Sequence, residues 1–278
     1  MSSLYCFLNG KILPLQKARI SPLDLGILRG YGVFDFLRTY QGKPFLLKEH
    51  LRRFRNSAEN LNLKIPYSDE EIERIIRELV KRNKILDAGI RLVLTGGPSS
   101  DAETVKKPTF FILTGKIKEI PQRYYLKGAK IVTVDGKREN PYIKSINYIN
   151  YTKLANSIFP RQKDVVEIVY APNGKVLEGG TSNIFIFKKG VLQTPKEGVL
   201  MGITRNFVIQ LAKKNFSVQE RPIFLDDLYN AEEAFLTSTN KEIMPVVQAD
   251  NFVIGEGKVG ENTKILMEMF KKEVKKIN

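Results

Sequence analysis

The chain has 278 residues, 42% hydrophobic and 27% charged, and its 45 basic and 30 acidic residues leave a formal net charge of +15. At about 150 residues per domain, this is the composition of a globular protein with about two domains. The single Cys6 and the single His50 exclude an intrachain disulfide framework and a multi-cysteine or His-rich metal site, and no apolar run approaches the roughly 18 residues of a membrane helix.

The first part of the chain reads as strands, two helices and further strands. Asn9-Gly10, a strong hairpin signal, separates two short strands, and Gln41-Gly42 forms a second turn. Apolar residues at helical spacing follow Lys48, and Ser68-Asp-Glu-Glu71 opens another helix as a capping box. The predicted strands are Tyr5–Leu8, Lys11–Leu13, Val33–Tyr40, Ile90–Leu94 and Thr109–Leu113, and the first helix covers residues 48–61. Cys6 is expected in a buried strand and His50 at the surface or at a helix start, and neither is given a role.

A charged segment, residues 116–122, is the predicted linker between a small first domain, residues 1–115, and a larger second domain, residues 123–278. Strands and helices mix beyond it without regular βαβ alternation, which predicts the α+β class. An Asn173-Gly174 hairpin is expected to join two of the strands. The predicted strands are Lys130–Val134, Val165–Tyr170, Lys175–Leu177, Asn183–Phe187, Val191–Gln193 and Ala234–Leu236, and the helices are Ile203–Lys214 and Thr263–Lys276.

Three places in the sequence have the residues to hold an anion. Gly202-Ile203-Thr204 stands where a helix begins, so free backbone N–H groups and the helix dipole could face a phosphate. Ser238 and Thr239 follow a predicted strand, and Arg53 on the first helix could bind the same anion bidentately. Each also has an ordinary structural reading: Thr204 as an N-cap, the hydroxyls in a plain turn, and Arg53 in solvent.

Lys144 and Glu178 are the candidates for chemistry at a cofactor. Lys144 stands between Ile143 and Ile146, and partial desolvation there would favour Schiff-base chemistry. Most lysines in so lysine-rich a protein are only solvated. Glu178 precedes paired glycines, either in an ordinary turn or next to a ligand nitrogen. From the residues alone, a lysine and a phosphate site indicate a pyridoxal-phosphate enzyme as one reading.

The motifs of the second half resemble the signature of the class IV, or fold-type IV, pyridoxal-phosphate aminotransferases. Glu178 is followed by Asn183-Ile-Phe, then by Leu192-x-Thr194, then by Leu200-x-Gly-Ile-Thr-Arg205. This family contains branched-chain aminotransferases, D-amino acid transaminases and aminodeoxychorismate lyase. The resemblance extends from Asn9-Gly10 to Val259-Gly260, and it implies a two-domain fold with a small N-terminal α/β lobe and a larger C-terminal mixed-sheet lobe.

The resemblance also implies a role for each candidate residue. Lys144 is expected to form the internal aldimine with pyridoxal 5′-phosphate and then to act as acid and base. Glu178 is expected to pair with the protonated pyridine nitrogen. Tyr148, one residue displaced from the branched-chain pattern, is assigned to the cofactor's phenolic oxygen. The phosphate is assigned to Arg53, Ile203, Thr204, Ser238 and Thr239.

Substrate specificity is read from two further segments. Tyr31–Arg38 resembles a stretch of the branched-chain enzymes, although Asp35-Phe36 replaces their Glu-Gly. The Arg-x-His carboxylate site of Bacillus-type D-amino acid transaminases is missing, because the residues there are Thr95-Gly-Gly-Pro98. A less common D-amino acid transaminase group shares the strings at Leu28–Asp35 and Gly89–Gly97.

That similarity implies that Arg91 and Arg29 hold the substrate carboxylates, with Arg29 reaching in from the neighbouring subunit of a homodimer. The alternative for Arg29 is a structural ion pair with Asp24 or Asp35. Two arginines on separate loops would fix dicarboxylates without a metal.

The predicted function is therefore transamination between a D-amino acid and a 2-oxo acid, with small-molecule amino and keto acids as partners. The alternatives are an L-branched-chain aminotransferase and, less favoured, an aminodeoxychorismate lyase. Neither nucleic acid nor membrane is expected as a partner, because Lys and Arg are spread along the whole chain and no nucleic-acid motif occurs. One cysteine and no signal-peptide pattern predict a cytoplasmic protein.

Overall fold

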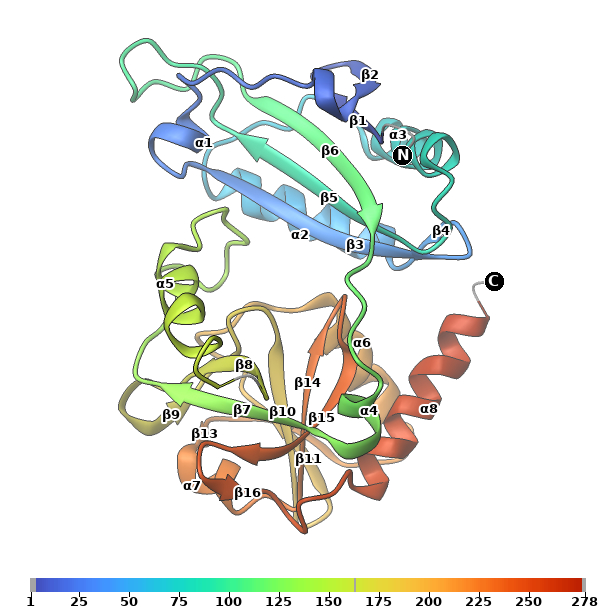
Figure 1. The fold of residues 1–278 in the computed structure, drawn as a ribbon, viewed down its shortest axis with the longest axis vertical. Helices are drawn as coiled ribbons and strands as arrows, with labels where there is room; N and C mark the ends of the chain where they lie inside the picture. The colour runs from blue at the N-terminus through green and yellow to red at the C-terminus, as the bar shows by residue number, and fades with distance from the viewer. Residues whose placement is uncertain (1–3, 163, 277–278) are drawn as a thin grey trace. The chain divides into compact units, whose positions relative to one another are not determined.

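The computed structural model describes residues 4–162 and 164–276 (Figure 1). By its internal contacts the chain divides into two compact units. The first unit holds the chain up to Lys118 together with Ile143–Tyr148, and the second holds Glu119–Tyr142 and Ile149–Lys276. The predicted division at residues 116–122 places all of the chain beyond it in the second domain. It therefore does not include this return of Ile143–Tyr148 to the first unit.

The first unit is built on an antiparallel sheet. Among the described residues its strand order is β2-β1-β6-β5-β3-β4. The predicted hairpin at Asn9-Gly10 is confirmed: both residues have positive φ, 44° and 94°, and β1 pairs with β2 across them. The strands are β1 (Tyr5–Leu8), β2 (Lys11–Pro14), β3 (Gly32–Tyr40), β4 (Lys43–Pro44), β5 (Ala88–Thr95) and β6 (Thr109–Lys116).

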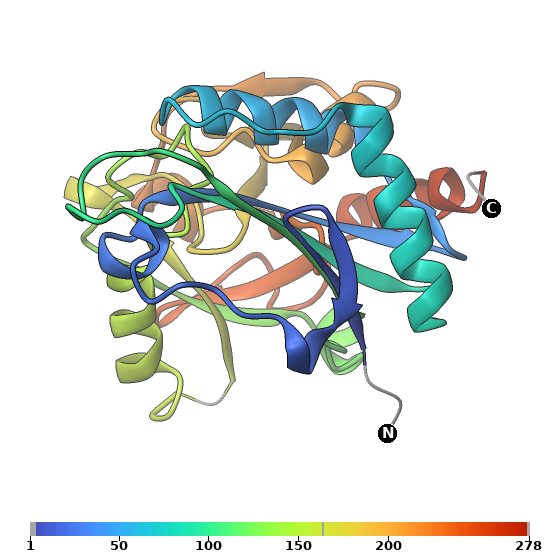
Figure 2. The same cartoon turned by 90° about the horizontal axis from the view of Figure 1, so that it is seen from above.

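Two long helices cover one face of this sheet (Figure 2). Helix α2 (Leu47–Glu59) and helix α3 (Asp69–Asn83) bury their apolar sides in the same core cluster as β3, β5 and β6. The predicted capping box is confirmed, since Ser68 Oγ accepts from Glu71 N and Glu71 Oε2 accepts from Ser68 N. The 3-10 helix η1 (Leu15–Lys17) and helix α1 (Leu25–Leu28) lie between β2 and β3.

The second unit is built on a mixed sheet. Among the described residues its strand order is β12-β11-β10-β14-β15-β7-β8, with β16 paired to β15. The pairs β7–β8, β7–β15 and β11–β12 are parallel. The strands are β7 (Ala129–Val134), β8 (Val165–Tyr170), β9 (Lys175–Val176), β10 (Asn183–Lys188), β11 (Val191–Thr194), β12 (Val218–Glu220), β13 (Ile223–Phe224), β14 (Glu233–Ser238), β15 (Glu242–Ala249) and β16 (Phe252–Val253).

The predicted hairpin at Asn173-Gly174 is only partly right. The turn exists, and Asn173 and Gly174 have positive φ of 50° and 78°. However, β9 pairs with β13 in a separate two-stranded sheet. The chain before and after the turn shares backbone hydrogen bonds where Tyr170 meets Leu177 and Glu178.

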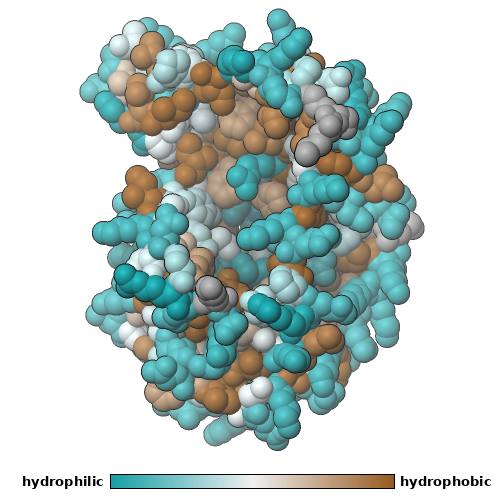
Figure 3. All heavy atoms as spheres, in the orientation of Figure 1, coloured by the Kyte–Doolittle hydropathy of each residue, from teal (hydrophilic) through white to brown (hydrophobic). Residues whose placement is uncertain are grey.

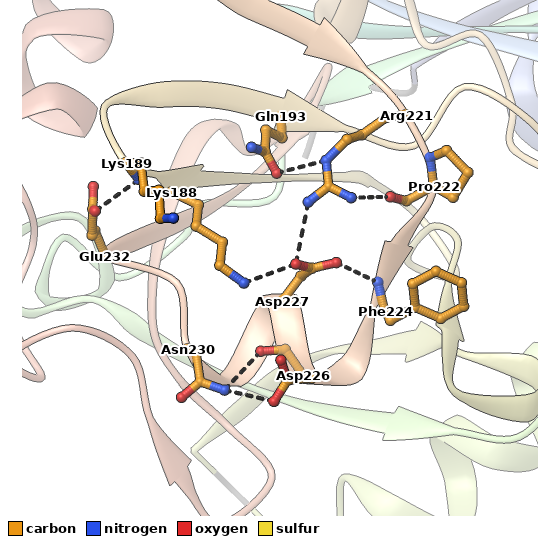
Figure 4. A network of polar contacts seen from close by, with 10 residues as sticks. All are labelled: Lys188, Lys189, Gln193, Arg221, Pro222, Phe224, Asp226, Asp227, Asn230 and Glu232. Atoms are coloured by element: carbon orange, nitrogen blue, oxygen red, sulfur yellow. Dashed lines mark hydrogen bonds and ion pairs between the residues drawn. The ribbon is translucent and has the colours of Figure 1, made fainter.

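Helices pack around this second sheet. Their bounds are α4 (Arg123–Lys127), α5 (Ile149–Ile158), η2 (Pro172–Gly174), α6 (Ile203–Ala212), α7 (Leu225–Tyr229) and α8 (Glu261–Lys275). A polar network fixes the start of α7 (Figure 4): Asp227 accepts from Lys188 Nζ at 2.8 Å, Arg221 Nη2 at 3.2 Å and Phe224 N at 3.2 Å. Within the described part of the chain, no helix is long and apolar enough to span a membrane.

Candidate active site

The segment around Lys144 is attached to the edge of β3 in the first unit. Phe34 N donates to Lys144 O at 2.9 Å, and Ile146 N donates to Gly32 O at 3.0 Å. On the helix side, Lys144 N donates to Ser57 Oγ of α2 at 3.2 Å. These backbone bonds and the burial of Ile143, 4% exposed, hold a half-buried Lys144 against a rigid strand and helix.

Three of the predicted site residues gather around one aromatic ring. Lys144 Nζ lies 4.6 Å from the centroid of the Phe34 ring. The Tyr148 ring packs on Phe34 edge to face at 5.7 Å, and Arg91 Cζ lies 5.7 Å from the same ring. Arg91 also lies 5.8 Å from the ring of Phe36, its partner across the β3–β5 ladder. A lysine amine, a phenol and an exposed guanidinium therefore share the sheet face that carries Phe34.

Arg53 and His50 lie at an anionic centre that the sequence did not reveal. The carboxylate of Asp35, fully buried, accepts from Arg53 Nε at 2.8 Å and Nη2 at 2.9 Å. It also lies 2.7 Å from His50 Nδ1. His50, expected at the surface or at a helix start, lies in the first turn of α2, but it is 2% exposed and so is not a surface residue. The reading of Arg53 as solvated is also wrong, because its Nε and Nη2 both donate to Asp35. Its remaining guanidinium nitrogen, Nη1, donates to none of the described residues.

The electrostatics of this cluster follow from burial and charge. Burial alone would raise the pKa of the Asp35 carboxyl, but the charge of Arg53 and the hydrogen bonds from Arg53 and His50 hold that pKa well below its usual value. Burial lowers the pKa of the His50 imidazole, despite the opposing attraction of Asp35. Since Asp35 is an acceptor, neutral His50 carries its proton on Nδ1.

Arg29 lies apart from this cluster, at the C-cap of α1, where Nη1 donates to Leu28 O at 3.1 Å. Within the described residues, Arg29 forms an ion pair with neither Asp24 nor Asp35, the two alternatives considered for it. Asp35 binds Arg53, and Asp24 caps α1 through Gly26 N and accepts from Thr109 Oγ1 at 2.7 Å. Arg29 is exposed, and so are Ile27 and Leu28, the apolar residues that precede it on α1. Figure 3 shows apolar side chains, drawn as brown spheres, gathered at the upper left of the view.

In the second unit, Glu178 is buried at the start of the loop that leads into β10. It is 3% exposed, and its Oε2 accepts from Leu200 N at 3.0 Å. Its Oε1 lies 3.6 Å from Arg138 Nη1, an ion pair that no pattern along the chain predicts. Asn183 Nδ2 donates to Leu200 O at 2.9 Å, so both ends of the 178–183 loop hold the segment just before α6.

The start of α6 is an uncapped helix N-terminus. Its N-cap is Gly202, with no side-chain cap, so the reading of Thr204 as the N-cap is wrong. Ile203 and Thr204 lie in the first turn, 8% and 6% exposed. Buried N–H groups at such an end need an acceptor, and none of the described side chains supplies one.

Ser238 and Thr239 lie where β14 ends, at the same end of the sheet. Thr237 is paired with Asn183, so the turn after β14 lies next to the Glu178 loop. Ser238 Oγ accepts from Lys241 N at 3.1 Å, which makes this residue part of the turn's own structure. Glu178, the start of α6 and the 238–241 turn therefore meet at one end of the β10–β14 pair.

Comparison with known proteins decides the family. A model of the family described as "Amino-transferase class IV" matches residues 32–249. The chain belongs to the class IV aminotransferases. It is 40% identical, over 95% of its length and 94% of the relative's, to a Methanocaldococcus jannaschii protein named "Putative branched-chain-amino-acid aminotransferase". It is 33% identical to "D-alanine aminotransferase" of Listeria monocytogenes, over 96% of its own length and 94% of the relative's.

Solved structures of class IV aminotransferases confirm the predicted fold type. A branched-chain amino acid aminotransferase from T.th., bound to pyridoxamine 5′-phosphate, superposes with a TM-score of 0.92 at 28% identity, covering 100% of this chain and 96% of that one. The same enzyme with N-(5′-phosphopyridoxyl)-L-glutamate gives a TM-score of 0.91 at 29% identity, with the same coverage.

Class IV aminotransferases use pyridoxal 5′-phosphate, and the predicted cofactor is thereby confirmed. The donors and acceptors of this chain fit it. The uncapped start of α6 offers N–H groups to a phosphate, the hydroxyl of Thr237 is buried with no hydrogen-bond partner in the described residues, and Glu178 is a buried carboxylate. Lys144 is the residue predicted to supply the amine. When bound, the cofactor supplies an electron sink for bonds broken at the amino-acid Cα.

Proposed function

We propose that this class IV aminotransferase transfers the amino group between a D-amino acid and a 2-oxo acid, with D-glutamate/2-oxoglutarate and D-alanine/pyruvate as substrate pairs. The observation that carries the proposal is the position of Arg91. Its guanidinium lies beside the ring of Phe34, on which Lys144 Nζ also lies. A substrate carboxylate bound bidentately to Arg91 would hold the Cα near the amine that exchanges its proton.

The residues have separate tasks in this proposal. Lys144 binds the cofactor covalently and moves the proton at the substrate Cα. Glu178 holds a proton on the pyridine nitrogen, and Tyr148 binds the phenolic oxygen. The phosphate is bound by Arg53, Ile203, Thr204, Ser238 and Thr239, through a guanidinium, backbone N–H groups and hydroxyls.

The loop after β5 supports the use of Arg91, since two of its positions cannot carry a carboxylate-binding side chain. A Cβ at Gly97, which has a φ of 76°, would overlap the carbonyl oxygen of Lys107. A Cβ at Gly96 would lie 2.8 Å from Leu25 Cδ1. An arginine or histidine at Gly97 would need the backbone to move, and one at Gly96 would need the Leu25 side chain to move, so the loop favours cations placed elsewhere for the substrate carboxylates.

We further propose a homodimer in which Arg29 of the partner subunit completes carboxylate binding. Around α1, Leu23 is 52% exposed and Ile27 is 62% exposed. Apolar surface beside an arginine that lacks an acidic partner among the described residues is consistent with an interface. Sedimentation velocity tests this, because Ile27→Asp should yield monomers. Activity assays on the same variant should show a larger loss with dicarboxylate substrates than with monocarboxylate ones.

L-branched-chain transamination is the competing function. It is favoured by the Tyr31–Arg38 stretch and by the 40% identical relative, whereas the 33% identical relative favours D-amino acids. The two differ in which face of the Cα presents its hydrogen to Lys144.

A stereospecific donor screen separates the two functions. Each enantiomer of alanine, glutamate and leucine is offered with a saturating 2-oxo acid acceptor, and the new amino acid is measured by chiral chromatography. We expect turnover of D-alanine and D-glutamate with L-leucine at background. Turnover of L-leucine with both D-amino acids inert would establish the branched-chain function instead.

A further inference from the structure

Glu167 is a buried carboxylate for which the proposed chemistry has no use. It lies on β8 with 0% exposure, one strand position before Ile168. Burial would raise the pKa of this carboxyl, but the charge of Lys241 and hydrogen bonds from Thr181 and Ser182 leave it lowered. A buried charge is retained only with a full set of partners, so the identity of those partners indicates its role.

Its partners on one side belong to the Glu178 loop. Glu167 Oε2 accepts from Thr181 Oγ1 at 2.6 Å and from Ser182 Oγ at 2.8 Å. The loop lies directly on this carboxylate, because a Cβ at Gly179 would lie 2.8 Å from Glu167 Cγ. Thr181 follows Glu178 closely along the loop, so the position of the Glu178 carboxylate depends on these bonds.

Its partner on the other side closes the turn after β14. Lys241 Nζ donates to the same oxygen, Glu167 Oε2, at 3.0 Å, and to Thr181 Oγ1 at 2.7 Å. The backbone N–H of Lys241 in turn donates to Ser238 Oγ at 3.1 Å. A single carboxylate oxygen therefore joins the loop that carries Glu178 to the turn that carries Ser238 and Thr239.

The second carboxylate oxygen of Glu167, Oε1, contacts α5 and the backbone of β8. Glu167 Oε1 accepts from Ile168 N at 3.1 Å and lies 3.5 Å from the Tyr151 hydroxyl. Both oxygens are thus held, and the carboxylate has one orientation. Charge-assisted bonds of this kind are stronger than neutral ones and constrain direction as well as distance.

We propose that Glu167 is a positioning residue that sets the Glu178 loop and the 238–241 turn in one fixed arrangement. The inference rests on the proposed cofactor roles of Glu178 and Thr239. It predicts that removing the charge of Glu167 disturbs both ends of the bound cofactor together, the pyridine ring through Glu178 and the phosphate through the turn. A residue that serves stability alone would disturb neither.

The test is Glu167→Gln in the holoenzyme, with two spectroscopic readouts. The absorbance of the bound cofactor, recorded against pH, reports on the ring, and the ³¹P chemical shift reports on the phosphate. Glu178→Gln is the reference that moves the absorbance, and Thr239→Ala is the reference that moves the ³¹P signal. We expect Glu167→Gln to move both signals and to raise the dissociation constant of pyridoxal phosphate roughly tenfold.

The matched control is Asp227→Asn. Asp227 also accepts from a lysine and belongs to a polar network in the same unit, and it has no role in the proposed site (Figure 4). We expect it to change the melting temperature with both signals unchanged. If Glu167→Gln does not fold, the isosteric Thr181→Val removes the 2.6 Å bond at an exposed residue and should move both signals less far.

A Glu167→Gln or Thr181→Val protein with a lower melting temperature and neither signal moved, or only one of them, overturns the proposal. These readouts do not depend on which amino acid is the donor. If the wild-type enzyme prefers L-leucine, the proposed D-amino acid function fails while the result for Glu167 stands. If the reference variants leave the absorbance and ³¹P signals unmoved, the assumed roles of Glu178 and Thr239 fail, and the proposal for Glu167 fails with them.

Discussion

The guanidinium of Arg53 binds the buried carboxylate of Asp35 through two parallel hydrogen bonds, Nε to Oδ2 at 2.8 Å and Nη2 to Oδ1 at 2.9 Å. The residue proposed to bind the cofactor's phosphate is thus oriented by β3, while α2 carries it. The same carboxylate orients His50 from the previous turn of that helix.

Asp35→Asn should destabilise the protein strongly. Removing one charge of a buried pair leaves the other uncompensated, at a cost of about 3–5 kcal/mol in the free energy of unfolding. Urea unfolding measures this. The control is Glu73→Gln, whose partner Arg77 lies on the exposed side of α3, where an ion pair contributes little. Equal stability of Asp35→Asn and the wild type would show that Arg53 finds another partner.

The stability of the fold should depend on pH through His50. Its pKa is lowered in the folded protein from the usual 6.5, so below pH 6.5 the unfolded chain binds a proton that the folded protein refuses. The free energy of unfolding should therefore fall as the pH drops from about 7.5 to about 5.5. His50 is the only histidine of the chain, so His50→Gln should flatten this slope in urea titrations. An unchanged slope would assign the effect to other groups.

Arg91 and Arg53 should fail in different ways when they are replaced. Arg91→Gln removes a bidentate carboxylate partner, so the KM for 2-oxoglutarate should rise about 10–100-fold while the absorbance of the bound cofactor stays unchanged. Arg53→Gln should raise the dissociation constant of pyridoxal phosphate instead. Steady-state kinetics at saturating cofactor and fluorescence titration of the apoprotein measure the two. The reverse pattern would mean that the two assignments are exchanged.

Lys144 should be the residue that binds the cofactor covalently. Borohydride reduction of the holoenzyme is expected to attach the cofactor to the peptide that contains Lys144, as detected by peptide mass. Lys144→Ala should lose both this label and catalytic activity. Lys153→Ala, at an exposed position of α5, is the control and should keep them. A label on another lysine in fully active enzyme would remove the basis of the proposed chemistry.

Gly180 should be intolerant of any side chain. A Cβ there would overlap the ring of Tyr151, so Gly180→Ala should cost about 1–3 kcal/mol by overpacking and should loosen the Glu178 loop. Gly115→Ala is matched in chemistry and meets no atom within 4 Å, so its effect on the melting temperature should be small. Thermal unfolding of both variants checks this, and equal melting temperatures would show that Tyr151 moves aside.

Local signals in the sequence were accurate where neighbouring residues alone decide the structure. The Asn9-Gly10 hairpin and the Ser68 capping box depend on backbone angles and bonds within a few residues. Strand β15 (Glu242–Ala249) was missed because Pro245 interrupts its pattern. In the fold, Pro245 pairs with Phe235 of β14, and the pairing of β15 with β7 starts after it, at Val246. Helix α5 was missed because none of its residues is buried, which leaves a weak apolar face.

The sequence by itself determined the family and the cofactor, because the spacing of Glu178, Asn183 and the Gly202–Arg205 string is readable along the chain. Only the tertiary structure decided which charges are paired. The bonds of Asp35 to Arg53 and His50, of Glu178 to Arg138, and of Glu167 to Lys241 join residues 15 to 74 positions apart. No local pattern encodes such pairs, because each buried charge takes its partner from whatever the packed sheets and helices bring within reach.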